Sequence, residues 1–564
     1  MTEATAPIAA SPRTSNAARI GWAILILATL YVCYFSHLGA IGFVGPDEPR
    51  YAWIARDMAE TGDWVTPRLY GKPWFEKPPL LYWGAALSFK LFGVSEAAAR
   101  LPSAISALLA TLALAWLALR LYGAETARWL LLLLPTTVGM IGFSHAAATD
   151  MPFSGMLTIA MVCAAVVLGL TRNENTPILP RTPWLALLLF GFFLGLAVLA
   201  KGPAAIILSG GAVFFWALFT KRWRDAFRLL HPIAIASFCL TALPWYILCA
   251  RRNPDFFRIF IIEHNFKRYL TPEFQHIQPF WYYLPVLFLA FLPWTALLLW
   301  SSIESATHIV HARRVDHSTL FLINWSAFCI LFFSISQSKL PGYILPAFPA
   351  IGLLLAHDLG CRLQSRRASI RFLCLSIAAS LLAVGFVVYL LSEKIPFVTD
   401  LRPPASITAF ADLMFLGAAA VAILSLMRRN HTTAAMAVTA LLLPIFLTFG
   451  LDGLQLDPGV SARRASQEAM ELLLAPALQQ ATSYKLSRGL KYGLEFYLHR
   501  EINEWDSSAG HETVVFTTRR GSAELQQLGI SCSHYVAYQA VDFCGITDAV
   551  RKLPGRLNES GQPH

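Results

Sequence analysis

Residues 45–83 read GPDEPRYAWIARDMAETGDWVTPRLYGKPWFEKPPLLYW and follow directly on the first apolar segment of the chain. The Gly-Pro pair at their start ends that segment, because proline lacks the amide hydrogen that a continuing helix needs. Residues 49–60 alternate apolar and polar side chains at helical spacing, which predicts an amphipathic helix at a membrane interface. The segment 78–93 is apolar, but it is short and carries Lys90. We therefore expect it to lie along the interface or dip into it rather than span the membrane.

The composition of the whole chain is that of a membrane protein. Its 564 residues are 56% hydrophobic and 14% charged, whereas an ordinary soluble domain has about 25% charged residues. A water-soluble globule is therefore excluded. A bilayer core needs about 20 apolar residues per helix, and on that basis we predict about thirteen transmembrane helices. They lie near 19–41, 97–121, 125–144, 151–170, 183–200, 203–220, 232–250, 280–301, 318–337, 341–360, 370–391, 406–427 and 432–451.

The positive charge predicts how the chain lies in the membrane. The net charge is +11, yet residues 452–564 carry 11 basic and 13 acidic residues, so the excess belongs to the membrane part. With residues 1–18 in the cytoplasm, the basic connections fall on the cytoplasmic side, as positive residues usually do. These connections are KRWRDAFR (221–228), HARR (311–314), CRLQSRR (361–367) and RRN (428–430). The loops 42–96 and 251–279 of a transmembrane domain over 19–451 then face outward.

The segment 452–564 is expected to form a small extracytoplasmic α/β domain. Helical patterns such as RGLKYGLEFYLHR alternate with strand-like runs such as TVVFTT. Cys532 and Cys544 are its two cysteines. Because an extracytoplasmic space is oxidising, a disulfide between them is one hypothesis, and a pair of free thiols is the other. We find no catalytic motif in this segment.

Ionisable residues gather at the predicted outer ends of spans. Asp47 follows the first span, and Asp150, Lys201 and Lys339 occupy similar ends in HAAATDMPF, LAKGP and SKLPGYILP. Taken alone, each acid is as well explained by a helix cap or a solvated loop charge. Charged side chains near the bilayer core cost free energy, so those that a membrane protein keeps there usually have a function. Their convergence on one side therefore predicts a shared outward-facing site.

The outer loop 251–279 adds a histidine and an arginine. In FIIEHNFKRYL, His264 and Arg268 are four residues apart and share a face if the stretch is helical. A histidine beside carboxylates can bind a metal or can simply be hydrogen-bonded, and the sequence leaves both roles open. Arginine and lysine at a membrane surface suit a lipid phosphate.

Six motifs together resemble the ArnT-like branch of the GT-C glycosyltransferases, relatives of the aminoarabinose transferases of lipid A and, more distantly, of the protein O-mannosyltransferases. They are GPDEPRYAWIARDM, GDWVTPRLYGKPWFEKPPLLYW, TDMPF, LAKGP, EHNFKRYL…QPFWYYLPV and SKLPGYILPAFPA. The resemblance keeps the same order over roughly residues 20–360. It implies an α-helical polytopic GT-C fold in the bacterial inner membrane, with the active site and the C-terminal domain on the periplasmic side. We expect a monomer that contacts membrane lipids and binds no nucleic acid.

The resemblance also implies a reaction and a set of site residues. A sugar would move from a polyprenyl (undecaprenyl) phosphate donor to lipid A or another envelope glycan, by an inverting single displacement. Asp47 and Asp150 would be catalytic, and Glu76 and His264 would hold a divalent cation such as Zn. The implied residues of the donor phosphate site and cavity are Arg50, Tyr51, Lys77, Lys201, Arg268, Lys339 and Tyr343.

Several alternatives remain open on the sequence. Asp47 would act as a base toward a hydroxyl acceptor, but would orient the acceptor or stabilise positive charge if the acceptor is a phosphate. A protein O-glycosyltransferase of the same fold is the nearest alternative function. A polytopic transporter or a membrane scaffold is a different class. A transporter is disfavoured because transporters place ionisable groups near the bilayer midplane, whereas here they lie at span ends.

Overall fold

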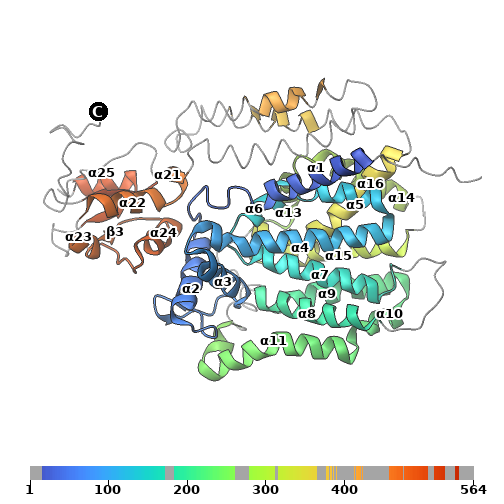
Figure 1. Ribbon diagram of the computed structural model, residues 1–564, viewed down its shortest axis with the longest axis horizontal. Coiled ribbons are helices and arrows are strands. Elements are labelled where there is room, and N and C mark those ends of the chain that lie inside the picture. The colour runs from blue at the N-terminus through green and yellow to red at the C-terminus, as the bar shows by residue number, and fades with distance from the viewer. Residues whose placement is uncertain are drawn as a thin grey trace, which may run out of the picture.

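The chain forms a bundle of long apolar helices with a small domain at one end (Figure 1). The structure is a computed structural model that describes residues 16–171, 183–260, 278–310, 315–364, parts of 377–423, 457–473, 475–505, 514–527 and 540–544. The helices of the bundle are α1 (Asn16–Tyr34), α4 (Glu96–Tyr122), α5 (Ala124–Leu133), α6 (Val138–Ser144), α7 (Asp150–Val167), α8 (Trp184–Lys201), α9 (Ala204–Thr220), α11 (Pro232–Arg252), α13 (Tyr283–Ala290), α14 (Thr295–Val310), α15 (His317–Ile335) and α16 (Phe348–Gln364). Short helical turns join them: α10 (Trp223–Phe227), η1 (Arg228–Leu230), η4 (Phe280–Tyr282) and η5 (Pro341–Ala347).

The bundle is that of a multi-pass membrane protein. In the described ranges, six helices are long and apolar enough to cross a membrane, or seven if the bent pair α5 and α6 is one span. Shorter apolar helices include α9 and the segment Arg19–Tyr34. The predicted spans 370–391, 406–427 and 432–451 fall wholly or partly outside the described residues. The number thirteen therefore stays a prediction, while the polytopic helical fold is confirmed.

Two predicted spans are broken rather than continuous. The helix expected over 125–144 bends by 64° between α5 and α6, and the one expected over 280–301 is interrupted between α13 and α14. Pro135 and Pro293 lie in the breaks, where each removes a backbone donor. The breaks also contact each other, because Trp294 Nε1 donates to Thr136 Oγ1 at 2.9 Å.

Glycines allow the central helices to pack closely. A Cβ on Gly155 of α7 would lie 2.8 Å from the Ser106 carbonyl oxygen of α4, and one on Gly191 of α8 would lie 2.1 Å from the Ala234 carbonyl oxygen of α11. Such close backbone contact between helices is typical of membrane bundles, where small residues replace the hydrophobic driving force. The buried centre of the bundle fixes the helix ends that carry the site.

The loop after α1 lies across one end of the bundle (Figure 1). It contains α2 (Asp47–Thr61), the hairpin of β1 (Arg68–Leu69) and β2 (Lys72–Pro73), and α3 (Leu80–Phe92). The helix predicted over 49–60 is confirmed by α2. At 13 residues, α3 is shorter than a span, as expected for 78–93.

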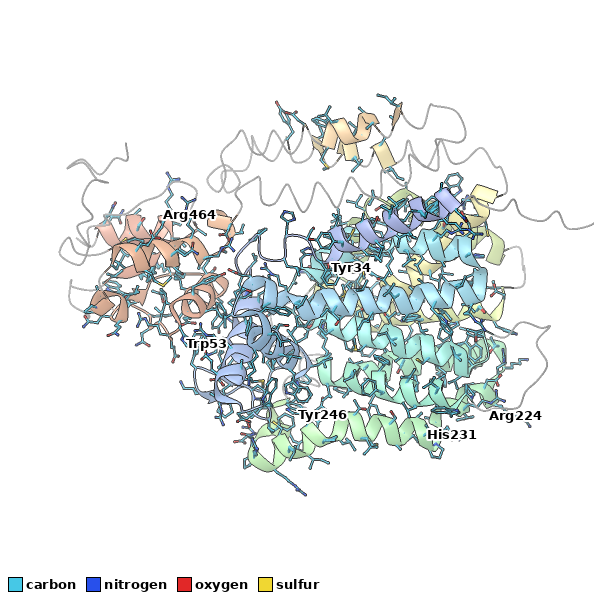
Figure 2. The ribbon with its side chains drawn as sticks, in the orientation of Figure 1. Tyr34, Trp53, Arg224, His231, Tyr246 and Arg464 are labelled. Carbon is cyan, nitrogen blue, oxygen red and sulfur yellow. The ribbon has the colours of Figure 1, made fainter. Side chains whose placement is uncertain are left out.

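The C-terminal region has its own small sheet and core. Its elements are α21 (Asp457–Val460), α22 (Arg463–Leu472), α23 (Ala475–Gln479), β3 (Thr482–Ser483), α24 (Arg488–Leu498), β4 (Val515–Thr517), α25 (Arg519–Gln527) and β5 (Asp542–Cys544). Strand β4 pairs parallel with β3 and antiparallel with β5. Cys544 is disulfide-bonded, whereas Cys532 lies outside the described residues. This region lies beyond α2, and Arg224 and His231 mark the opposite end of the bundle (Figure 2).

Candidate functional site

A cavity of about 480 Å³ lies between the start of α2 and the start of α7. Asp47 and Asp150 both line it, so two acids far apart in sequence face one space. Each acid is the first residue of its helix, where the positive end of the helix dipole stabilises a carboxylate. The remaining wall comes from the segment after α1, from Glu48 of α2 and Arg100 of α4, from the end of α6 and the residues after it, and from residues 340–342. The arrangement can therefore receive a polar group between two carboxylates.

Arg50 links Asp47 to Glu76. Its Nη2 donates to Asp47 Oδ1 and its Nη1 to Glu76 Oε2 at 2.9 Å, while Nε donates to the Pro46 carbonyl oxygen at 2.8 Å. Burial acts to lower the pKa of Arg50, but the carboxylates of Glu76 and Asp47 outweigh it and raise that pKa above its ordinary value. The guanidinium therefore stays charged and fixes the Asp47 carboxylate. The Asp47 side chain is 49% exposed, against 5% for Arg50, so Asp47 remains accessible to a substrate.

Glu48 and Arg100 form a buried ion pair next to Asp47, and this pair was not predicted from the sequence. Arg100 of α4 donates to both carboxylate oxygens of Glu48 and to three backbone carbonyls within 38–42, at 2.7 to 2.9 Å. Glu48 also accepts from the amides of Val44 and Ala147. All five N–H groups that a guanidinium carries are thus used. The signal in the sequence was an arginine in the early turns of an apolar span.

Asp150 is paired across the cavity wall with a lysine. Lys201, the last residue of α8, places Nζ 2.5 Å from Asp150 Oδ1. The same Nζ lies 4.7 Å from the centre of the Tyr343 ring, within the range of a cation–π contact. The structure thus brings together Asp150, Lys201 and Tyr343, which the resemblance assigns to one cavity.

Gly342 is the residue packed against Asp150, and Gly342→Ala tests how closely that acid must be held. A Cβ there would lie 2.4 Å from Asp150 Oδ1 and 2.8 Å from Phe143 Cε1. The acid must shift, and a displacement of about 1 Å in a reacting group can cost roughly 100-fold in rate. We expect a roughly 10- to 100-fold lower turnover, together with the loss of about 1 to 3 kcal/mol of stability that overpacking a buried position causes.

The control for this variant is Gly210→Ala on α9. A Cβ at Gly210 meets no atom within 4 Å in the described part of the chain, so wild-type turnover is expected. Equal turnover of Gly342→Ala and Gly210→Ala would show that the position of Asp150 is not critical.

The other predicted site residues lie in different surroundings. Lys339 is buried and its Nζ donates to the Ser336 carbonyl oxygen at 2.6 Å, near the end of α15. Tyr51 is buried against Tyr82, and burial, with the nearby Glu76 carboxylate, raises the pKa of its hydroxyl. Lys77 is half-buried next to Glu76. His264 and Arg268 lie outside the described residues.

The predicted cation site is only partly within the described chain. Carboxylate oxygens such as those of Glu76 suit a divalent cation, although its Oε2 already accepts a hydrogen bond from Arg50. The second predicted ligand, His264, is not among the described residues. Within those residues there is no group of three or more His, Cys, Asp or Glu side chains that could hold a metal ion. The cation site therefore stays a prediction.

The sequence of the chain is similar to known glycosyltransferases. Residues 20–260 match the family model of dolichyl-phosphate-mannose-protein mannosyltransferase. The undecaprenyl phosphate-alpha-4-amino-4-deoxy-L-arabinose arabinosyl transferase of Enterobacter sp. (strain 638) is 32% identical over 336 residues, which are 60% of this chain and 59% of that protein. The transferase of the same name from Pseudomonas aeruginosa (strain UCBPP-PA14) is 32% identical over 376 residues, 66% of each protein. The match with the Enterobacter protein thus spans about three fifths of that protein's length.

A solved glycosyltransferase structure has the same fold. ArnT from Cupriavidus metallidurans bound to undecaprenyl phosphate superposes with a TM-score of 0.72, over 94% of this chain and 99% of that chain, at 24% identity. Its apo structure gives a TM-score of 0.73 over 95% and 100% of the two chains. The likeness therefore extends over nearly the whole chain and establishes an ArnT-like GT-C architecture.

Proposed function

Because the chain belongs to the ArnT-like family of GT-C glycosyltransferases, we propose that it transfers a sugar from undecaprenyl phosphate to lipid A. The observation that carries the proposal is the cavity between Asp47 and Asp150, placed beside the Arg50–Glu76 pair. The names of the curated relatives give an aminoarabinose donor, and we propose the same donor class here. The alternative of a transporter finds no support in the fold or the family.

The geometry suits a single displacement at the anomeric carbon. The leaving group is a phosphate that is already charged, so cations assist its departure and no acid is needed to protonate it. We assign this role to Lys77, next to Glu76, and to Arg268. Asp47 is held by Arg50 with part of its carboxylate accessible. It would take the proton of a hydroxyl acceptor, or would orient a phosphate acceptor.

We place the reaction on the periplasmic side of the bacterial inner membrane. The basic connection that contains Arg224 lies at the opposite end of the bundle from Trp53 of α2 and Arg464 of the C-terminal region (Figure 2). Basic residues favour the cytoplasmic side. This arrangement supports an outward-facing cavity, reached by a lipid donor from the outer leaflet.

The test of the function supplies the donor and follows the sugar. Membranes that contain the chain, given undecaprenyl phosphate with a radiolabelled 4-amino-4-deoxy-L-arabinose, should release undecaprenyl phosphate and label lipid A. Label in protein instead would favour the protein O-glycosyltransferase suggested by the match of residues 20–260. Donor consumption no faster than in membranes without the chain would contradict the proposal.

We further propose that Glu76 and His264 bind one divalent cation, such as Zn, which would supply positive charge to the departing phosphate. The purified protein should carry about one equivalent of metal by elemental analysis. Glu76→Ala should lose the metal and leave a low activity that added cation does not change. Glu60→Gln, an exposed acid on α2, should retain both metal and activity. Full activity of the wild type in chelator, with no metal bound, would refute the cation site.

A further inference from the structure

The C-terminal region is docked tightly on the loop that carries Asp47. Helix α24 lies against α2, and Tyr70 of the β1–β2 turn donates to the buried Glu495 of α24. The ring of Phe43 packs edge-on against Phe496, with ring centres 4.8 Å apart. A Cβ at Gly489 would lie 2.8 Å from the backbone of Gly45. The two parts therefore meet without a gap next to the start of α2.

Polar contacts also fasten the backbone before Asp47. Asp457 Oδ1 accepts from the Gly42 amide at 2.6 Å, and Tyr497 Oη accepts from the Phe43 amide at 3.0 Å. Arg463 donates to the carbonyl oxygens of Gly39 and Ala40 at 2.9 and 2.8 Å. Arg100 holds other carbonyls of this segment from the membrane side. The segment leading to Asp47 is thus fixed from both sides.

One side chain of the C-terminal region reaches the site itself. The Arg50 guanidinium carbon lies 5.3 Å from the centre of the Tyr492 ring, closer than to the rings of Trp74 (5.6 Å) and Tyr51 (5.8 Å). Arg50 is the group that joins Asp47 to Glu76. Its N–H groups bond to carboxylates while aromatic rings pack around it. Such stacking lowers the number of orientations that a guanidinium can adopt.

We infer that Tyr492 is a positioning residue for the transfer reaction. It holds the Arg50 guanidinium in the orientation that binds Asp47 and Glu76, so the C-terminal region completes the site in the membrane domain. This inference rests on the proposed function. It gives the C-terminal region a part in turnover in addition to any contact with the acceptor.

The first test distinguishes the effect of losing the Tyr492 ring from the effect of weakening the contact between the C-terminal region and α2. Tyr492→Leu should lower kcat about 3- to 30-fold, the effect of losing one partly buried cation–π contact, with little change in the donor KM. Tyr492→Phe keeps the ring and should retain most of the activity. His499→Ala is the matched control, because His499 follows α24 and contacts Arg56 and Glu60 of α2. It should turn over like the wild type.

A second test does not depend on the leucine variant folding. Replacing Tyr492 with phenylalanines of increasing fluorination keeps the ring's shape but removes the negative charge from its face. If Tyr492 positions Arg50, kcat should fall stepwise with fluorination at constant thermal stability. If the ring only fills space, kcat should not change across the series, and the inference would be wrong.

A double-mutant cycle identifies Arg50 as the intermediary. Once Arg50→Lys has removed the planar guanidinium, Tyr492→Leu should cost less than about twofold further, because contacting residues are non-additive. Additive losses would overturn the inference. A wild type that transfers no sugar would instead refute the proposed function, so the two failures are distinguishable.

Discussion

Asp47→Asn is expected to lower sugar transfer by at least about 100-fold, the smallest effect usual for a group that acts on the reacting proton. The substitution keeps the size of the side chain and an oxygen that can accept the hydrogen bond of Arg50 Nη2. What it removes is the negative charge at the cavity. Because the Asp47 side chain is half exposed, the variant should fold and insert like the wild type.

The measurement is initial-rate transfer of labelled sugar by purified protein, with thermal unfolding followed in parallel. Glu60→Gln is the control, since Glu60 is an exposed acid of the same helix that pairs with Arg56 and His499 on the surface, and such pairs contribute little. It should transfer at the wild-type rate. An Asp47→Asn variant within tenfold of the wild type would remove Asp47 from the chemistry.

Local patterns predicted the parts of the site that depend on neighbouring residues. The periodicity of residues 49–60 predicted α2, and the positions of Asp47 and Asp150 at span ends predicted that they share a space, as the cavity shows. Both predictions require only the periodicity of a helix and the assignment of each span end to one side of the membrane. The breaks at Pro135 and Pro293 were missed, because an apolar run looks continuous through a proline and membrane helices tolerate it.

Contacts between residues far apart in the chain could not be predicted from the sequence. Nothing near Tyr492 in the sequence indicates that its ring lies on Arg50. Arg50 belongs to the first outer loop, whereas Tyr492 belongs to the C-terminal region. The resemblance implies a place for Arg50 in the donor phosphate site and cavity, and that role stays a prediction, but its hydrogen bonds to Asp47 and Glu76 could not be read from the sequence. Whether an exposed cation binds a ligand or a neighbouring acid depends on tertiary placement, and composition cannot distinguish these cases.

Arg100→Met should destabilise the protein by about 3 to 5 kcal/mol, because it leaves the buried Glu48 carboxylate without its arginine partner. It also leaves three carbonyls between residues 38 and 42 without their donor. Arg100→Lys should fall in between, since an ammonium has three donors where the guanidinium uses five. The readout is the temperature at which half of the protein in detergent remains monodisperse.

Arg120→Met is the control for this series, because Arg120 lies on the same helix but is exposed near Trp116. Its unfolding temperature should match the wild type. The graded order wild type, lysine, methionine would separate this network from a simple ion pair, in which retaining the positive charge would restore nearly all the stability. If Arg100→Met were as stable as Arg120→Met, the bonds from Arg100 to Glu48 and to the carbonyls of residues 38–42 would not contribute to stability, and helix packing alone would hold this segment.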